Sequence, residues 1–106
     1  MTSEHLAAIL AERVMGWGIG PDRFMTGGRQ WLPRWYFQPT ERLQDAFRLL
    51  EQTKPEEYAM GAAENGFFWA RVRIAGVARE ARETSQARAL TFAIARAIGI
   101  EPEVSG

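Results

Sequence analysis

The sequence contains no cysteine, and its 106 residues include one histidine and one lysine. Without cysteine the chain has no disulfide, no thiolate ligand for zinc and no cysteine nucleophile. A single histidine excludes a histidine-rich metal cluster, and the position of His5 near the start of a helix predicts a solvated side chain. These absences remove most metal and covalent chemistry, so the sequence predicts no catalytic residues, no metal site and no cofactor.

Long hydrophobic runs and an excess of one charge are also missing. No apolar segment approaches the roughly 20 residues that cross a bilayer, and the N-terminus lacks a basic stretch followed by an apolar one. The 13 basic and 13 acidic residues cancel, which argues against the uniformly basic surface of a dedicated nucleic-acid-binding protein. We therefore expect a cytoplasmic protein that is not an enzyme, with one domain over residues 1–100 and a flexible tail at 101–106.

Arginine supplies every basic residue except Lys54. A GC-rich genome explains this bias through codon usage, and selection for planar, bidentate donors at an interface is the alternative. The charges are also unevenly distributed, because residues 71–96 hold six arginines against Glu80 and Glu83. The zero net charge is therefore the sum of a basic stretch and acidic regions elsewhere.

Hydrophobic spacing predicts three helices, over residues 3–15, from residues 39–41 to just before Pro55, and over residues 85–98. Ser3, Thr40 and Ser85 are the expected N-terminal caps. Residues 31–37 alternate aromatic side chains and predict a strand, which Pro33 places at a sheet edge or at the start of the strand.

The Asn65-Gly66 pair predicts a hairpin, because both residues accept the positive φ of a two-residue turn. A two-residue loop pairs Glu64 with Phe67 and Ala62 with Trp69. This register places one set of side chains on one face, Phe68, Ala70, Val72 and Ile74, and a second set on the other, Phe67, Trp69, Arg71 and Arg73. Both faces begin apolar, so we expect cover on both sides near the turn. Residues 75–84 fit either a continued strand or a charged connection.

These elements follow the order α-β-α-β-β-α. Three strands and three amphipathic helices predict a small α+β protein, an α-β-α layered sandwich with helices on each side of a three-stranded, mainly antiparallel sheet. Residues 16–30 combine glycines with Trp17, Ile19 and Phe24, and they predict a long loop packed on the body of the domain. Long packed loops are often functional.

Two sets of residues are candidate binding sites. Aromatic and arginine side chains gather around the glycine-rich loop, as in a protein-binding hot spot: Trp17, Arg23, Arg29, Trp31, Arg34, Trp35 and Tyr36. The alternative is that these rings complete a core poor in aliphatic residues. The second set, Phe67, Trp69, Arg71 and Arg73, resembles the aromatic strand of RNA-recognition sheets and predicts weak single-stranded nucleic-acid binding. Its alternative is a core role for Phe67 and Trp69 beneath a helix.

Several stretches resemble the phage ABA-sandwich domain, a family of small bacteriophage and prophage proteins. They are residues 11–17 (AERVMGW), the aromatic strand running into Pro39-Thr40, residues 43–51 (LQDAFRLLE) and residues 87–97 (ARALTFAIARA). The resemblance implies an α-β-α layered fold and a protein of the bacterial host cytoplasm, and it carries over no catalytic or binding residues. It also implies a protein partner of host or phage origin, including a host-defence component. A homodimer is left open, because a chain this small can expose some of its four tryptophans.

Overall fold

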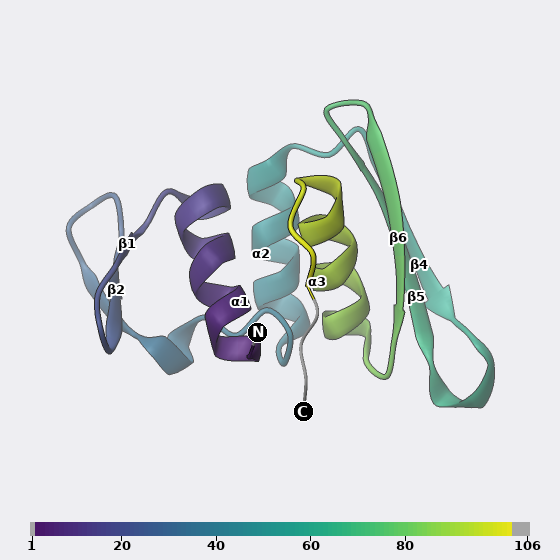
Figure 1. Cartoon of the computed structure of the whole chain (residues 1–106), viewed down its shortest axis with the longest axis horizontal. Coiled ribbons are helices and arrows are strands. Elements are labelled where there is room, and N and C mark those ends of the chain that lie inside the picture. Colours follow the sequence, from purple (N-terminus) through teal and green to yellow (C-terminus); the bar gives the residue numbers. More distant parts are fainter. Residues whose placement is uncertain (1, 103–106) are drawn as a thin grey trace.

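Residues 2–102, which the computed structural model describes, form three α-helices flanked by two antiparallel sheets (Figure 1). The helices are α1 (Ser3–Leu10), α2 (Leu43–Thr53) and α3 (Gln86–Ala97). The small sheet contains β1 (Gly18–Ile19), β2 (Arg23–Met25) and β3 (Trp31–Pro33). The large sheet contains β4 (Glu57–Ala62), β5 (Phe68–Ile74) and β6 (Val77–Glu83). The predicted α+β class and the order of the helices are confirmed.

The arrangement of the sheets differs from the prediction. The sequence indicated one sheet with helices on both faces, whereas the three helices lie side by side between two sheets (Figure 1). The predicted loop at residues 16–30 contains β1 and β2, and the predicted strand at 31–37 divides into β3 and a 3-10 helix, Arg34–Tyr36. Strands of two or three residues are too short to show an alternating pattern, so the small sheet was missed.

The first helix begins and ends through local backbone chemistry. The side-chain oxygen of Thr2 accepts a hydrogen bond from the backbone N–H of His5 at 3.0 Å, so the cap lies one residue before the predicted Ser3. A π-helical turn, Ala11–Met15, continues α1, and Gly16 ends it with a φ of 73°. Leu6 and Leu10 are fully buried, which fixes this helix against the core.

The other two helices differ in how well the sequence predicted their starts. Ser85 caps α3 as expected, because its Oγ accepts from the backbone N–H of Arg88 at 3.1 Å. The start of α2 was placed too early, because a turn at residues 38–42 precedes it. Thr40 is buried in that turn and does not cap the helix. The side-chain hydroxyl of Thr91 donates to the carbonyl of Pro39 at 2.7 Å and ties the turn to α3.

The hairpin between β4 and β5 has the predicted turn but a different register. Asn65 and Gly66 adopt φ values of 60° and 78°. Two hydrogen bonds to Phe67 close the turn. The backbone N–H of Phe67 donates to the carbonyl of Glu64, and its carbonyl accepts from the backbone N–H of Ala63. This bulge shifts the ladder by one residue, so Phe68 lies opposite Ala62 and the predicted pairing is wrong.

Residues 75–84 resolve into a second hairpin. Ala75 and Gly76 form a two-residue turn with φ values of 51° and 80°, and Val77 then pairs with Ile74. The strand β6 follows directly, so the charged sequence in this region continues the sheet. The chain therefore gains a third strand in the large sheet that the sequence left undecided.

The two faces of β5 divide as the sequence predicted. Ala70, Val72 and Ile74 are buried, and α3 packs on β5 and β6. Arg71 and Arg73 point to the opposite face, where none of the helices within residues 2–102 lies (Figure 1). The expected helical cover on this second face is therefore wrong, because all three helices are on one side of the large sheet.

Two further predictions concern the ends and helices of the chain. Residues 103–106 of the predicted tail lie outside the described residues, and Pro102 is buried. Within residues 2–102, every helix is too short or too polar to span a bilayer.

Candidate functional site

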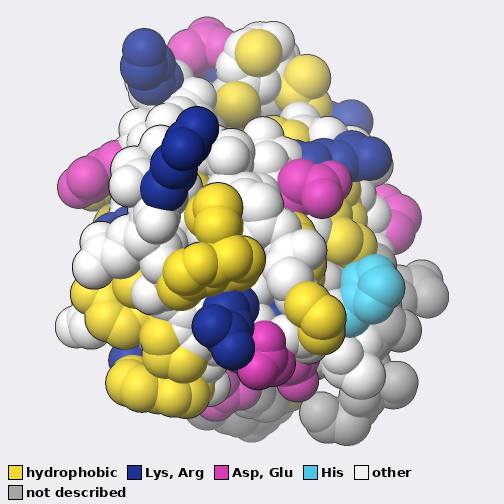
Figure 2. Space-filling model, turned by 90° about the vertical axis from the view of Figure 1, so that its left-hand side faces the viewer, with side chains coloured by type: hydrophobic (Ala, Val, Ile, Leu, Met, Phe, Trp, Pro, Cys, Tyr) yellow, Lys and Arg dark blue, Asp and Glu magenta, His cyan; other side chains and the backbone are white. Residues whose placement is uncertain are grey.

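The small sheet and the 3-10 helix after it expose large hydrophobic side chains at one end of the molecule. Trp31, Trp35 and Tyr36 are 51%, 60% and 43% exposed, and Ile19 is 36% exposed. Figure 2 views this end and shows hydrophobic side chains interspersed with basic ones. We call this surface the aromatic end and define it by Ile19, Arg23, Arg29, Trp31, Arg34, Trp35 and Tyr36.

Trp17 does not belong to this surface. It is 7% exposed, and its ring centroid lies 5.3 Å from that of Phe37 and 5.7 Å from that of Phe24. These three rings fill the space behind the small sheet in tilted and edge-to-face contacts, which aromatic side chains favour. The core alternative is therefore correct for Trp17 and wrong for Trp31, Trp35 and Tyr36.

The strand pairing explains which side chains reach the surface. Phe24 pairs with Leu32 and points inward, so the flanking Arg23 and Trp31 point outward. The guanidinium carbon of Arg23 lies 5.4 Å from the centroid of the Trp31 ring, within range for a cation–π contact. The outer face of the small sheet thus presents a tryptophan with an arginine over it.

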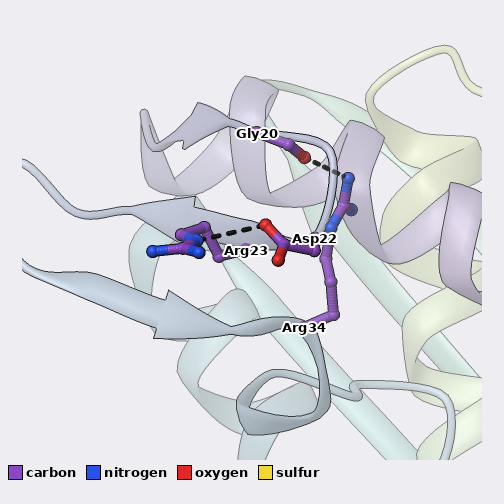
Figure 3. Close-up of polar contacts among 4 residues, drawn as sticks. All are labelled: Gly20, Asp22, Arg23 and Arg34. Atoms are coloured by element: carbon purple, nitrogen blue, oxygen red, sulfur yellow. Dashed lines mark hydrogen bonds and ion pairs between the residues drawn. The ribbon is translucent and has the colours of Figure 1, made fainter.

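Asp22 holds Arg23 in this position (Figure 3). The Nε atom of Arg23 donates to the Asp22 carboxylate at 3.1 Å. This hydrogen bond, together with the positive charge of Arg23, lowers the pKa of Asp22 below its ordinary value. Both side chains are more than half exposed, so the pair orients the guanidinium and contributes little to the stability of the fold.

Arg34 connects two segments of the aromatic end. Its Nη2 atom donates to the carbonyl of Gly20 at 2.8 Å (Figure 3). Its guanidinium carbon lies 4.8 Å from the Phe24 ring centroid. Its Nε atom is buried and lacks a hydrogen-bond partner among the described residues. Arg34 therefore positions the turn between β1 and β2, in addition to the surface role that the sequence predicted.

A pocket of about 500 Å³ opens beside Trp35. Phe24, Trp35 and Phe37 form its apolar wall, and Arg34 also lines it. The remaining lining residues come from the first turns of α1 and from the segment before α2: Ser3, Glu4, Ala7, Gln38, Thr40 and Glu41. Sequence reasoning missed these residues, because only the tertiary fold brings the start of α1 beside Trp35.

Arg29 lies at the tip of the small sheet. It occupies the turn between β2 and β3 with a φ of 60°, and its backbone N–H donates to the carbonyl of Thr26 at 2.9 Å. The turn is exposed, so the Arg29 side chain extends the basic character of the aromatic end to its rim.

The second predicted set lies on the outer face of the large sheet. Trp69, Arg71 and Arg73 share this face, and the Trp69 indole lies so close to Gly61 that a Cβ there would be 2.8 Å from Nε1. Phe67 belongs to the turn, with the Arg82 guanidinium 5.6 Å from its ring centroid. The core role predicted for Phe67 and Trp69 beneath a helix is wrong, because none of the described helices covers this face (Figure 1).

Acidic side chains partly neutralise this face. The Nε atom of Arg73 lies 3.5 Å from a carboxylate oxygen of Glu57. Glu80 lies directly opposite Arg71 in the register of β5 and β6 and places a negative charge beside it. The outer face therefore offers less free positive charge than the run of arginines in the sequence suggests.

The described residues do not bring three or more histidine, aspartate or glutamate side chains together as a metal site. The chemistry that the structure does bring together is aromatic, aliphatic and guanidinium. Such groups form contacts with other molecules through stacking, apolar burial and bidentate hydrogen bonds.

The fold and this surface define a small α+β protein with an exposed aromatic end flanked by arginines. The chain belongs to the phage ABA sandwich domain family, whose model matches residues 8–97, and the predicted resemblance is confirmed. A phage protein from Bacillus cereus ATCC 14579, known from a 2.0 Å crystal structure, superposes with a TM-score of 0.78 at 14% sequence identity. The match covers 97% of this chain and 93% of that one, so the two share a fold. No curated protein matches the sequence significantly.

Proposed function

We propose that this phage-type protein acts without catalysis, by binding another protein through the aromatic end. The observation that carries the proposal is the exposure of Trp31, Trp35 and Tyr36, each more than 40% exposed, at one end of the molecule. Exposed apolar clusters on small proteins mark interaction sites, and tryptophan and tyrosine supply much of the binding energy at interfaces. The partner is a host or phage protein of the bacterial cytoplasm, a host-defence component being one such partner.

The local geometry supports this role because the surface is already ordered. Asp22 fixes Arg23 over Trp31, and the hydrogen bond from Arg34 to Gly20 fixes the turn beside them. Side chains held in place before binding lose little conformational entropy on association. The pocket beside Trp35 adds a concave site for an anchor residue of the partner.

Affinity capture from a host lysate, followed by mass spectrometry, tests the aromatic end. Trp31→Ala and Trp35→Ala are compared with Tyr58→Ala, which removes a ring that is 52% exposed on the large sheet. We expect each tryptophan variant to weaken capture of the specific partner by about 30-fold, the effect of losing a hot-spot residue, and Tyr58→Ala to retain it. An identical partner set for the wild type and the Trp31→Ala/Trp35→Ala double variant would contradict the proposal.

A second candidate function is weak binding of single-stranded nucleic acid on the outer face of the large sheet. Trp69, Arg71 and Arg73 lie together on this uncovered face, which supports the idea. If it is correct, binding of a fluorescent oligonucleotide weakens steeply as salt rises, and Arg71→Glu weakens it more than Arg13→Glu on the helical layer. No binding at low salt would exclude this function.

A further inference from the structure

The strand β6 is an edge strand of the large sheet, because β5 is its neighbour on one side and no described strand pairs with the other side. The two-residue turn makes Ile74 and Val77 a hydrogen-bonded pair, so alternate residues from Val77 bond to β5. The backbone groups of Ala78, Glu80 and Arg82 therefore point away from the sheet.

Two arginine contacts agree with this direction. The carbonyl of Glu80 accepts from Nη1 of Arg96 at 3.0 Å, and that of Ala78 accepts from Nη1 of Arg79 at 2.7 Å. Both acceptors lie on the free side of β6. The edge is thus seven residues long, and side chains occupy two of its outward carbonyls.

The charges along β6 are complementary to those of a second copy of β6 that runs in the opposite direction. Residues 79–83 read Arg-Glu-Ala-Arg-Glu, with Ala81 at the centre. When a second copy pairs antiparallel about a two-fold axis at Ala81, Arg79 lies opposite Glu83 of the second copy. Glu80 then lies opposite Arg82 of the second copy, and symmetry repeats both pairs. Every charged residue in this register faces an opposite charge, which stabilises cross-strand pairs.

The neighbouring registers lack this property. Residues whose backbone groups point away from the sheet must lie opposite one another to form hydrogen bonds between the copies. The pairing can therefore shift only by amounts that keep these residues opposite one another. A shift of one step in one direction sets Glu80 opposite Glu80 of the second copy, and a shift in the other sets Arg82 opposite Arg82. Like charges directly opposite are destabilising, so the sequence specifies the register centred on Ala81.

We propose that two copies of this chain associate through antiparallel pairing of β6 about Ala81, which joins the two large sheets into one. The pairing forms an isologous two-fold interface, in which the same strand serves both copies. The Glu83 carboxylate already accepts from Nε of Arg88 at 2.7 Å, and it has lone pairs left for Arg79 of the second copy. The Arg96 and Arg79 side chains move aside so that backbone N–H groups bond the outward carbonyls. This surface is on the opposite side of the helices from the aromatic end, so the dimer and the proposed function are independent (Figure 1).

Sedimentation equilibrium measures the association directly. We expect a concentration-dependent dimer that weakens as salt screens the ion pairs. Glu80→Arg places two arginine pairs across the axis and raises the dimer dissociation constant by about tenfold or more. The Glu80→Arg/Arg82→Glu double variant exchanges both charges within the strand and restores the dimer. A wild-type protein that stays monomeric at all concentrations, or a dimer unaffected by Glu80→Arg, would overturn the proposal.

Cysteine cross-linking tests the register without depending on the charge variants. The chain has no cysteine, so Ala81→Cys introduces one thiol per copy, directly opposite its equivalent in the proposed dimer. Oxidation is expected to convert this variant to a covalent dimer. Ala78→Cys is the matched control, since its two thiols would be roughly 20 Å apart along the strands. Efficient cross-linking of Ala78→Cys, or none of Ala81→Cys in a folded protein, would contradict the register.

Discussion

The four tryptophans of the chain serve different purposes. Trp17 fills the core behind the small sheet, and Trp69 packs closely against Gly61 on the outer face of the large sheet. Trp31 and Trp35 remain exposed at the aromatic end. Residue type alone therefore does not separate core from surface here, because the same side chain meets three environments.

The first prediction compares a buried tryptophan with an exposed one. We expect Trp17→Ala to lower the free energy of unfolding by about 3–5 kcal/mol, because it leaves a cavity beside Phe24 and Phe37. We expect Trp35→Ala, whose ring is 60% exposed, to change it by less than about 0.5 kcal/mol. Urea denaturation followed by circular dichroism measures both. Equal losses in the two variants would contradict the assignment of Trp17 to the core.

At this scale the sequence located the aromatic end but could not sort its members. The sequence predicted Trp31, Trp35 and Tyr36 as surface binding residues because they lie close to glycines and arginines. The burial of Trp17 depends on Phe24 and Phe37, which approach it only when the small sheet folds back on α1. The contribution of α1 to the pocket beside Trp35 was unpredictable for the same reason.

At the level of elements, two hairpins form the large sheet, and the residues of their turns differ in how well they suit a positive φ. The first uses Asn65-Gly66, both suited to positive φ. The second uses Ala75-Gly76, and its alanine carries a side chain at a φ of 51°. Left-handed backbone at an alanine is strained, so the second turn is held by the strands around it.

The second prediction follows from this strain. We expect Ala75→Asn to raise the free energy of unfolding by about 0.5–1 kcal/mol, because asparagine tolerates the left-handed region that this turn requires. Thermal and urea denaturation measure the change. The control is Ala78→Asn on β6, which has no such turn to relieve and is expected to give no gain. A loss of stability in Ala75→Asn would show that the turn is not strained at this residue.

Elements with strong local signals were predictable from the sequence, and elements that depend on distant partners were not. Ser85 and Gly99 set the limits of α3, and Asn65-Gly66 set the first turn. The bulge beside that turn has no sequence signal, and so the register was wrong by one residue. The edge strand β6 was ambiguous, because its alternating charges also suit a solvated connection.

For the whole molecule, the two sheets differ in the length of their strands and in how they pack against the rest of the protein. The large sheet pairs strands of six or seven residues and packs against α3. The small sheet pairs strands of two or three residues over a cluster of three rings. The sequence predicted the three helices and the α+β class, but a single sheet between helices was the simplest arrangement of three predicted strands.

The third prediction is a difference in local stability between the two sheets. We expect the backbone amides of β1, β2 and β3 to exchange with solvent faster than those of β5 and α3, because short strands have few hydrogen bonds and few buried neighbours. Hydrogen exchange followed by mass spectrometry of peptides resolves the two regions. Equal protection of residues 18–33 and 68–97 would contradict a difference in local stability.

The position of the small sheet in the sequence has a consequence for the proposed binding surface. The surface that it presents is encoded in one continuous stretch, residues 18–36, while α2, α3 and the large sheet are encoded after it. Few side chains of this stretch, chiefly Phe24 and Leu32, face the rest of the molecule. On the proposed binding function, we expect that a stretch that keeps these inward residues can be exchanged for another, which changes the partner that is bound while the scaffold stays the same.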